Sequence, residues 1–371
     1  MIRRPPRSTP SNSSAASDVY KRQVTFSDIY LDASNASIGN YLVVVYWDNS
    51  SGSINALEAG ELRINFTITH TTSLNRESPT SQKLEIYTGN IAIFKIKYID
   101  TDLGTGINNA NVSYRIKGWN NGVDVEGSMA EYGGGIYLLE VNTSGKLGSY
   151  LIDIWANCQY YDSQTYNNMF RLVIIDDTIL TYEAVPAIPY GENTTIIITF
   201  QNSTKDGITG ANIQCNVSSY SVIDNNDGTY SIEINTSDVS IWDIGKYIIN
   251  ITVSKPYYVN RSVLVPIQIR PIKTIFICES PTPIPWGRNI TFTVQFYVED
   301  NESSLNGQPI TSIDNLTFNE TEGYVYNYRA TGTPGEYELE VNVSSLVAGQ
   351  YIGNITIYKS KYYNKTVGFY S

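Results

Sequence analysis

The sequence predicts an all-β protein made of tandem antiparallel β-sandwiches, and three observations support this fold class. Three segments, spaced by about 95–100 residues, resemble one another along their length. Within each segment, short runs of alternating apolar and polar residues are bounded by Gly, Pro, Asn and Asp, as in strands joined by turns. No stretch carries an apolar stripe of helical period over a helical length, so we expect helices to be minor.

The first half of each repeat is a turn containing Gly, an alternating strand, a polar loop and a second strand. It begins at three places: "YTGNIAIFKIKYIDTDLGTGINNANV" from Tyr87, "PYGENTTIIITFQNSTKDGITGANI" from Pro189 and "PWGRNITFTVQFYVEDNESSLNGQPI" from Pro285. A chain of 371 residues with 42% hydrophobic residues can hold about two to four such domains, each with its own core.

The second half of each repeat is marked by two Gly-x-Tyr motifs. The first opens "GGIYLLEVNTS", "DGTYSIEINTS" and "PGEYELEVNVSS". The second follows about ten to fifteen residues later, in "GSYLIDIW" at Gly148, "GKYIINITV" at Gly245 and "GQYIGNITI" at Gly349. Near the front of the chain, "GNYLVVVYW" at Gly39 repeats only this second half.

Repeats of this length, with several short strands and turn signals every 8–12 residues or so, fit sandwiches of the immunoglobulin type. We therefore expect tandem immunoglobulin-like sandwiches arranged as a rod, with a disordered N-terminus. The tyrosines of the second motif stand where a tyrosine corner belongs, with the hydroxyl tied back to the backbone. The plainer interpretation is turn-then-strand chemistry. The candidates for the corner are Tyr150, Tyr247 and Tyr351.

These motifs resemble the tandem immunoglobulin-like repeats of bacterial and archaeal surface proteins, a class that includes invasin-like adhesin stalks. The resemblance covers residues 83–371 and implies an architecture and a cell-surface location, but no ligand. It gives the predicted domain organisation: a non-native or disordered leader at 1–23, a partial repeat and connector at 24–82, and repeats at 83–177, 178–272 and 273–371.

Residues 1–23 differ in character from the rest. Arg3, Arg4 and Arg7 are followed by Pro, Ser, Thr and Asn, without the apolar run of roughly 7–15 residues that a signal peptide needs. The basic residues are too scattered for a nucleic-acid-binding arm, and a disordered tail is the alternative. "MIRRPPRSTP" and "SSAASDVYKRQ" resemble translated sequencing-adapter read-through in open reading frames from environmental DNA. This implies a fragment whose true start, and any signal peptide, lies upstream.

The charge balance argues against a nucleic-acid partner. The net charge is −11, and residues 1–23 contribute +4 from five basic residues and one acid, which leaves −15 for the remainder. Binding to phosphates needs clustered Lys and Arg. We expect the partners to be a surface ligand of unknown identity or neighbouring surface proteins, with a membrane anchor in the missing sequence.

The acceptor pattern for N-glycosylation, Asn-x-Ser/Thr, occurs eighteen times after Val24, about threefold more often than chance predicts. Residues i and i+2 of a strand share one face, and in "YIINITV" Asn250 and Thr252 fall opposite the apolar residues. Because glycans need solvent, this pattern indicates a glycosylated, extracellular protein. The candidate acceptors are Asn65, Asn111, Asn142, Asn193, Asn202, Asn216, Asn235, Asn250, Asn260, Asn289, Asn315, Asn342, Asn354 and Asn364.

Few residues offer metal chemistry. The single histidine, His70, removes most zinc, Ser-His and Cys-His sites. Asp100 with Asp102, and the segment 224–227, echo the front of a calcium loop but lack its later ligands, so ordinary turns explain them better. Asp176 and Asp177 share this weak signal at a repeat boundary. We predict no metal site and no cofactor.

Catalytic chemistry is equally sparse. Four glutamates alternate along exposed strand faces, where a solvated role is far more common than the paired carboxylates of a glycosidase. The three cysteines are too few for a disulfide framework and fit small buried hydrophobes. We therefore predict no catalytic residues and no enzyme. The glutamates are Glu140, Glu233, Glu338 and Glu340, and the cysteines are Cys158, Cys215 and Cys278.

Two further features have structural explanations. Lys95 and Lys97 could form an intramolecular Lys–Asn crosslink, but the later repeats have Ile, Thr or Gln at the aligned positions. The pairs "QYY", "PYY" and "KYY" recur between the last two strands of each unit. They could stack on carbohydrate, but their equivalence favours turn-and-packing residues. These pairs contain Tyr160 and Tyr161, Tyr257 and Tyr258, and Tyr362 and Tyr363.

The function that these observations favour is a structural or adhesive stalk segment of a glycosylated cell-surface protein. Short linkers would limit bending, and glycans would shield strand edges. One alternative is a ligand-binding or carbohydrate-binding ectodomain in which the loops of one repeat carry specificity. The other is a set of accessory repeats in a larger extracellular enzyme.

Overall fold

The computed structural model describes residues 37–47, 60–279, 281–285, 287–318, 326–347 and 349–370. The leader at 1–23 lies outside the described residues. The described part of the chain consists of β-strands, turns and loops without an α-helix, and it forms immunoglobulin-like sandwiches. The predicted fold class is therefore confirmed. None of the described residues belongs to a helix with the length and hydropathy needed to cross a membrane.

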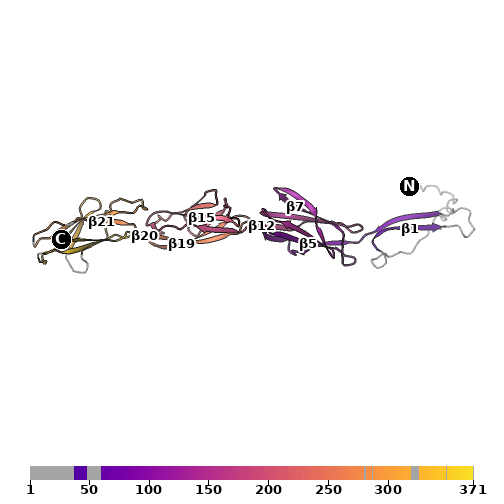
Figure 1. Cartoon of the computed structure of the whole chain (residues 1–371), viewed down its shortest axis with the longest axis horizontal. Coiled ribbons are helices and arrows are strands. Elements are labelled where there is room, and N and C mark those ends of the chain that lie inside the picture. Colours follow the sequence, from indigo (N-terminus) through magenta and orange to yellow (C-terminus); the bar gives the residue numbers. More distant parts are fainter. Residues whose placement is uncertain are drawn as a thin grey trace, which may run out of the picture. The chain divides into compact units, whose positions relative to one another are not determined.

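The chain divides into two compact units. The first unit contains a hairpin and most of sandwich 1. The second contains sandwiches 2 and 3, together with Glu85–Asn90 and Thr143–Gly148. Each sandwich has two layers of strands (Figure 1).

The hairpin joins β1 (Gly39–Trp47) and β2 (Gly60–Ile68) in antiparallel register, with Tyr41 opposite Phe66 and Val43 opposite Ile64. It forms a two-stranded sheet of its own.

Sandwich 1 has one sheet in the order β3-β5-β10-β9, with β6 paired to β5, and a second in the order β4-β12-β11-β7-β8. Strand β3 lies in the range predicted for the connector, and it pairs with β5 from Thr72 opposite Asp100. The strands are β3 (Thr72–Ser78), β4 (Lys83–Tyr87), β5 (Ile91–Asp100), β6 (Thr105–Gly106), β7 (Asn111–Asn120), β8 (Val123–Ser128), β9 (Ala130–Gly133), β10 (Ile136–Asn142), β11 (Gly148–Asn157) and β12 (Gln164–Ile175).

Sandwich 2 shows the immunoglobulin topology most completely. Its sheets are β13-β15-β18-β17 and β14-β20-β19-β16, which correspond to strands A, B, E, D and A′, G, F, C. Strand β14 runs parallel to β20, and the remaining strand pairs of this sandwich are antiparallel. The strands are β13 (Thr178–Tyr182), β14 (Ile188–Pro189), β15 (Thr194–Asn202), β16 (Asn212–Cys215), β17 (Tyr220–Asp224), β18 (Thr229–Ile234), β19 (Gly245–Ser254) and β20 (Arg261–Arg270).

Sandwich 3 repeats this plan with sheets β21-β22-β25-β24 and β23-β26-β27. Its strands are β21 (Thr274–Cys278), β22 (Ile290–Val298), β23 (Asn315–Phe318), β24 (Tyr326–Ala330), β25 (Glu336–Val341), β26 (Ile352–Tyr358) and β27 (Lys365–Tyr370).

The cores follow from the two-residue period of the strands. In β15, Ile196, Ile198 and Phe200 are fully buried while the residues between them are more exposed. They pack on Ile251 and Val265 of the opposite sheet. Each such side chain stabilises the fold by about 1.5–3 kcal/mol when it leaves water.

Packing explains why the first Gly-x-Tyr motif needs both its glycine and its tyrosine. The tyrosine is buried, and its hydroxyl donates to a backbone carbonyl in the loop after strand B. The glycine has positive φ, and a Cβ there would lie 2.3–2.8 Å from Gly106, Gly207 or Pro309, so only glycine fits. The hydrogen bonds are Tyr137 to Ile107 (2.9 Å), Tyr230 to Ile208 (2.6 Å) and Tyr337 to Ile310 (2.7 Å).

Candidate functional site

A backbone clamp closes each sandwich at the turn between its last two strands, here called the FG turn. The residue that begins the sandwich donates its backbone N–H to a carbonyl of this turn. Its own carbonyl accepts the N–H of the turn residue that lies two positions after that carbonyl. His70 donates to Tyr160 (3.0 Å), Asp176 to Tyr257 (2.9 Å) and Ile272 to Lys361 (3.0 Å), while Asp162 (3.1 Å), Val259 (3.0 Å) and Tyr363 (2.9 Å) donate in return.

The clamp shows where the structure puts the recurring tyrosine pairs. Tyr160, Tyr257 and Lys361 occupy equivalent positions with φ of 66°, 67° and 71°. Tyr161, Tyr258 and Tyr362 follow them and make the bridge to His70, Asp176 and Ile272. The pairs thus lie at the FG turns of the sandwiches.

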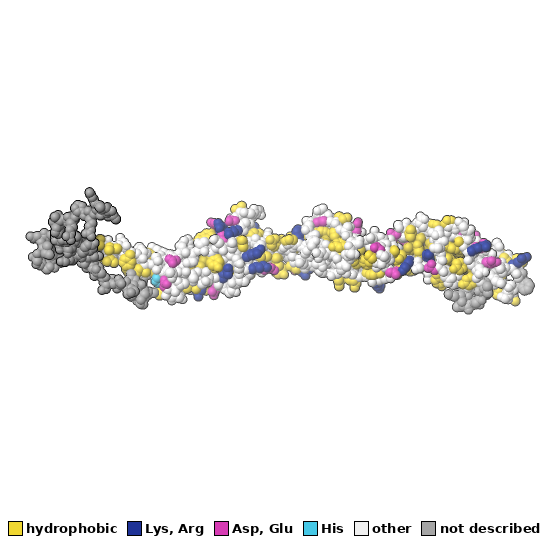
Figure 2. Space-filling view, turned by 180° about the vertical axis from the view of Figure 1, so that it is seen from behind, with side chains coloured by type: hydrophobic (Ala, Val, Ile, Leu, Met, Phe, Trp, Pro, Cys, Tyr) yellow, Lys and Arg dark blue, Asp and Glu magenta, His cyan; other side chains and the backbone are white. Residues whose placement is uncertain are grey.

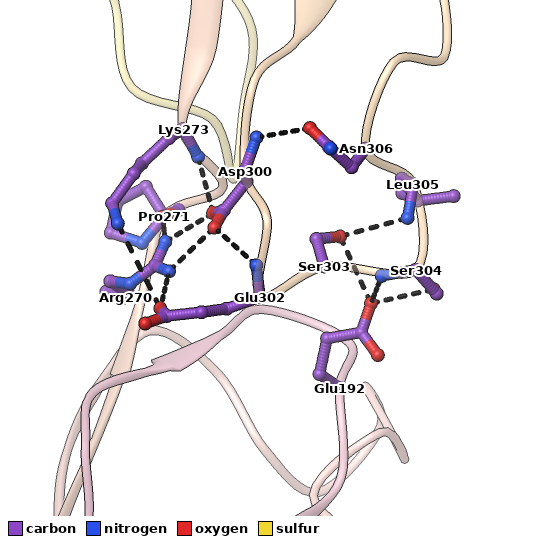
Figure 3. A network of polar contacts seen from close by, with 10 residues as sticks. All are labelled: Glu192, Arg270, Pro271, Lys273, Asp300, Glu302, Ser303, Ser304, Leu305 and Asn306. Carbon is purple, nitrogen blue, oxygen red and sulfur yellow. Dashed lines mark hydrogen bonds and ion pairs between the residues drawn. The ribbon is translucent and has the colours of Figure 1, made fainter.

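Sandwiches 2 and 3 are joined by a buried ion pair (Figure 3). Arg270 is the last residue of β20, and a single residue, Pro271, separates it from the clamp residue Ile272. The Arg270 side chain is 6% exposed. It donates to both carboxylate oxygens of Asp300, at 2.5 Å and 2.9 Å, and also to Glu302. Such a bidentate pair fixes the orientation of both partners.

The backbone also holds the Asp300 carboxylate, with Lys273 N–H at 2.9 Å and Glu302 N–H at 3.3 Å. The Arg270 guanidinium and these N–H groups lower the pKa of Asp300 to about 2 against the opposing effect of burial. The pair is therefore ionised at all physiological pH values. Because removing one partner would leave an uncompensated buried charge, the two sandwiches depend on each other here.

A second polar contact crosses the same boundary. Glu192, in the turn before β15, accepts hydrogen bonds from the Ser303 hydroxyl (3.1 Å), the Ser304 N–H (2.6 Å) and the Ser304 hydroxyl (2.7 Å) (Figure 3). Ser303 itself is 7% exposed. Glu192 therefore fixes the loop that also carries Asp300.

A third contact involves the FG turn of sandwich 3. Lys361 forms an ion pair with Asp243 of sandwich 2, and its Nζ lies 5.1 Å from the centre of the Tyr190 ring. Tyr190 packs against the cores of both sandwiches and donates its N–H to Arg270 O (2.9 Å). Three groups of contacts thus connect sandwich 2 to sandwich 3, and we call them the junction lock.

Sandwich 1 carries a related cluster at its beginning. His70 Nδ1 lies 2.7 Å from Asp100 Oδ2, and the two side chains are 8% and 1% exposed. Asp100 also accepts the N–H groups of Asp102 (2.9 Å) and Leu103 (3.1 Å). Asp102 accepts the N–H (2.8 Å) and hydroxyl (2.7 Å) of Thr71. The cluster therefore forms a hydrogen-bonded corner.

This corner is the one place, among the residues that the structure describes, where three potential metal ligands converge, within 4.8 Å of one another. The calcium-loop pattern in the sequence includes Asp100 and Asp102 but not His70, which is 30 residues away from Asp100. Protein donors already engage both carboxylates, so hydrogen bonding alone accounts for the cluster.

The other calcium candidates act as turn and boundary residues. Asp224 accepts Gly210 N–H at 2.6 Å, and Asp227 accepts the Thr229 N–H at 2.8 Å and its hydroxyl at 2.6 Å. Asp176 accepts the Ser203 hydroxyl at 2.6 Å, while Arg261 pairs with Asp177 at 2.5 Å.

The second Gly-x-Tyr motif places its hydroxyl against the backbone four residues earlier. Tyr247 donates to Asp243 O at 2.9 Å and Tyr351 to Val347 O at 2.8 Å. Tyr150 packs edge-on against Trp119, with ring centres 4.8 Å apart.

Thirteen of the fourteen candidate acceptor asparagines are exposed. The exception is Asn202, which ends β15 and is half-buried. Its carbonyl oxygen accepts the N–H groups of Thr204 (3.0 Å) and Asp206 (2.7 Å), and its amide donates to the Asp206 carboxylate at 3.1 Å. The Asn202 amide is therefore engaged in the loop.

The outward position of strand F differs between repeats. Asn250 and Asn354, both sequon residues, are exposed there, whereas sandwich 1 has a buried Asp153. Arg115 (2.7 Å) and Lys117 (2.9 Å) pair with it. Burial raises the pKa of Asp153, but the Asn168 N–H and the two cations outweigh burial and lower it overall.

The remaining candidates stay apart. Lys95 Nζ lies 4.7 Å from the Tyr132 ring centre. The three cysteines are free and half-buried, and burial raises the pKa of Cys215 and Cys278 to about 11, which disfavours the reactive thiolate. Glu140, Glu233, Glu338 and Glu340 lie on the outward faces of β10, β18 and β25.

A hollow of about 400 Å³ lies on sandwich 2 between the sequon residues Asn193 and Asn235. Tyr220 and Glu233 line it together with polar residues. Its mixture of one aromatic ring and several hydrogen-bonding groups could accept a small polar ligand.

Sequence reasoning missed the junction lock. Arg270 and Asp300 are 30 residues apart, and neither belongs to a motif. The available signal was the arginine at the end of an apolar strand, just before a proline and a new repeat, because an arginine in such a buried position needs a partner.

Three solved structures illustrate the similarity to known proteins. A tetra-tandem repeat from the extending region of a large adhesion protein is 13% identical, with 91% of this chain and 82% of that chain covered and a TM-score of 0.42. Invasin, a bacterial integrin-binding protein, is 18% identical over 78% of this chain and 56% of its own, with a TM-score of 0.32. The Escherichia coli adhesin FdeC is 13% identical over 78% and 92%, with a TM-score of 0.23. No protein-family model and no curated protein matches the sequence.

Proposed function

We propose that this chain is a stalk segment of an extracellular cell-surface protein, with a mechanical and adhesive role. The junction lock carries this proposal. A one-residue linker and a buried, bidentate Arg270–Asp300 pair restrict the motion of sandwich 2 against sandwich 3, and the default between domains without such an interface is free motion. A segment that resists bending can hold a binding module away from the cell surface.

The surface properties support an extracellular, glycosylated protein. Thirteen of the fourteen candidate acceptors are accessible, and glycans there would cover strand edges and outward faces. On the face drawn in Figure 2, acidic and basic side chains are interspersed, without the basic stripe of a nucleic-acid-binding protein. The partner is a surface ligand or a neighbouring surface protein.

Distances between spin labels at Asn226 of sandwich 2 and Thr333 of sandwich 3 test the stalk, with the native cysteines replaced by alanine. We expect a narrow distance distribution that broadens in Arg270→Ala. Arg329→Ala is the matched control, because Arg329 pairs with Glu338 within sandwich 3, and it should leave the distribution narrow. A wild-type distribution as broad as that of Arg270→Ala would contradict the proposal.

Glycopeptide mass spectrometry of the natural protein tests the surface coat. We expect occupancy at exposed sequons and none at Asn202, because its amide is hydrogen-bonded within a loop. Bare asparagines at every site would rule out the glycoprotein.

The hollow on sandwich 2 supports a second candidate, a carbohydrate-binding ectodomain. Screening the chain on a glycan array tests it. Binding that is lost in Tyr220→Ala and kept in Tyr328→Ala, a change at an exposed tyrosine outside the hollow, would favour this alternative.

A further inference from the structure

The hairpin β1–β2 has the features of the last two strands, F and G, of a sandwich. Tyr41 donates its hydroxyl to Ser37 O at 2.6 Å, four residues back, as Tyr247 and Tyr351 do with Asp243 and Val347. The register agrees as well: Gly39 is opposite Ile68 in the hairpin, and Gly245 is opposite Ile269 in sandwich 2.

The hairpin also meets sandwich 1 at the position used by the junction lock. Asn40 donates to the hydroxyl of Tyr160 at 3.3 Å. Tyr160 is the FG-turn residue of sandwich 1, equivalent to Lys361, which pairs with Asp243 of sandwich 2. The hairpin therefore contacts the FG turn of sandwich 1, just as sandwich 2 contacts the FG turn of sandwich 3.

One face of this hairpin is apolar and exposed. Val43, Leu62 and Ile64 are 42%, 51% and 47% exposed, and hydrophobic side chains reach the surface over the hairpin in Figure 2. The opposite face of β2 carries polar residues. These are Glu61, Arg63, Asn65 and Thr67.

The same positions are buried in sandwich 2. The shared register makes Val43 equivalent to Ile249 and Ile64 equivalent to Val265, which are 1% and 0% exposed. In sandwich 2 the sheet containing β15 and β18 covers them. A two-stranded hairpin alone is only marginally stable in water, and exposed apolar faces of this kind mark interaction surfaces.

We propose that the apolar face of β1–β2 is a docking surface for strands A to E of a further immunoglobulin-like sandwich. The occupant resembles residues 176–244, whose strands complete sandwich 2 together with β19 and β20. It has alternating apolar residues on its inner face. Because the chain order of these strands is A to G, the segment precedes Gly39 in the polypeptide. Docking completes one more sandwich of the series. It reproduces the packing of one sheet on the other that is found within sandwiches 2 and 3.

A chimaera tests this docking surface. Residues 1–38 of the full chain are replaced by residues 176–244, so that Ile244 joins Gly39 and the Ile-Gly step of the natural sequence is kept. A second chimaera carries residues 272–348, the corresponding part of sandwich 3. In at least one of them, we expect amide hydrogen exchange of 39–47 and 60–68 to slow at least tenfold, with one added unfolding transition. Exchange in the three existing sandwiches serves as the internal reference.

Substitutions in the hairpin provide the controls. Val43→Asp with Ile64→Asp should abolish the protection in the chimaera. Leu42→Asp with Asn65→Asp, a cross-strand pair on the opposite face, should retain it. Absence of protection in both chimaeras would overturn the proposal. So would a concentration-dependent dimer of the unaltered chain that protects the hairpin and is lost in the Val43/Ile64 variant, because the occupant would then be a second copy.

Discussion

The beginning of sandwich 1 and the boundary between sandwiches 2 and 3 use equivalent acidic residues in different ways. Asp100 is the last residue of strand B in sandwich 1, Asp300 lies two residues after strand B in sandwich 3, and both accept N–H groups of their own loop. Asp100 pairs with His70 of the same sandwich, whereas Asp300 pairs with Arg270 of the preceding one. Sandwich 2 has Asn202 at this position, and it accepts loop N–H groups without a cation partner.

The difference separates two roles of one position. An oxygen acceptor is needed in all three sandwiches to cap the loop, and Asn serves as well as Asp. A negative charge is useful where a cation reaches it, and Arg270 brings that cation to Asp300 from the preceding sandwich. The loop cap is thus common to the three sandwiches, while the junction lock adds a charge pair between sandwiches 2 and 3.

Removal of Arg270 should have the largest effect. Arg270→Ala leaves the Asp300 carboxylate buried without its cation, which costs about 3–5 kcal/mol. Denaturant-dependent hydrogen exchange of sandwich 3 measures this cost. Arg270→Met combined with Asp300→Asn should recover most of it, because Asn caps the same loop in sandwich 2. An Arg270→Ala variant that loses less than about 1 kcal/mol of unfolding free energy would behave like one without a surface ion pair. That result would contradict a special role for Arg270 compared with His70.

Acid should weaken the same boundary by a smaller amount. The pKa of Asp300 is about 2 in the folded chain and 3.8 without its partners. Because the folded value is lower, the stabilisation is complete above about pH 4 and is lost as the pH falls towards 2, by about 2 kcal/mol in total. Unfolding free energies of sandwich 3 measured across this range should fall less steeply in Asp300→Asn. Equal slopes would show that Asp300 is not the group responsible.

Loss of His70 should have the smallest effect. His70→Ala removes one hydrogen bond to Asp100, which retains the N–H groups of Asp102 and Leu103. We expect a cost of about 1–2 kcal/mol, confined to β3 and the FG turn of sandwich 1 and measured by hydrogen exchange. His70→Phe, which keeps a ring but not the hydrogen bond, is the matched variant. A cost equal to that of Arg270→Ala would mean that the His70–Asp100 contact and the Arg270–Asp300 pair stabilise their sandwiches alike.

Sequence patterns predicted the central strands well because those strands are buried on one face. Ile198 and Phe200 alternate with the polar Thr199 and Gln201, so both the strand and its inner face could be predicted. Strand β3 could not, because only Leu74 of its seven residues is buried and an edge strand needs no alternation. It therefore fell inside the predicted connector.

The candidate site was harder to predict than the fold. The strand sequons Asn65, Asn250 and Asn354 could be placed on outward faces from the two-residue period. Arg270 and Asp300 meet only after two sandwiches have folded and come into contact, and no local pattern records that contact. The Gly-x-Tyr motifs were visible as repeats, but the close backbone approach that requires Gly135, Gly228 and Gly335 is a property of the tertiary structure.

The clamp at each FG turn is made from main-chain atoms, and His70, Asp176 and Ile272 perform it equally well. A repeat can therefore be copied, deleted or exchanged by recombination without a compensating change at the position where it closes. Deletion of sandwich 2 or sandwich 3 would still need a compensating change elsewhere, because Arg270 and Asp300 come from different sandwiches.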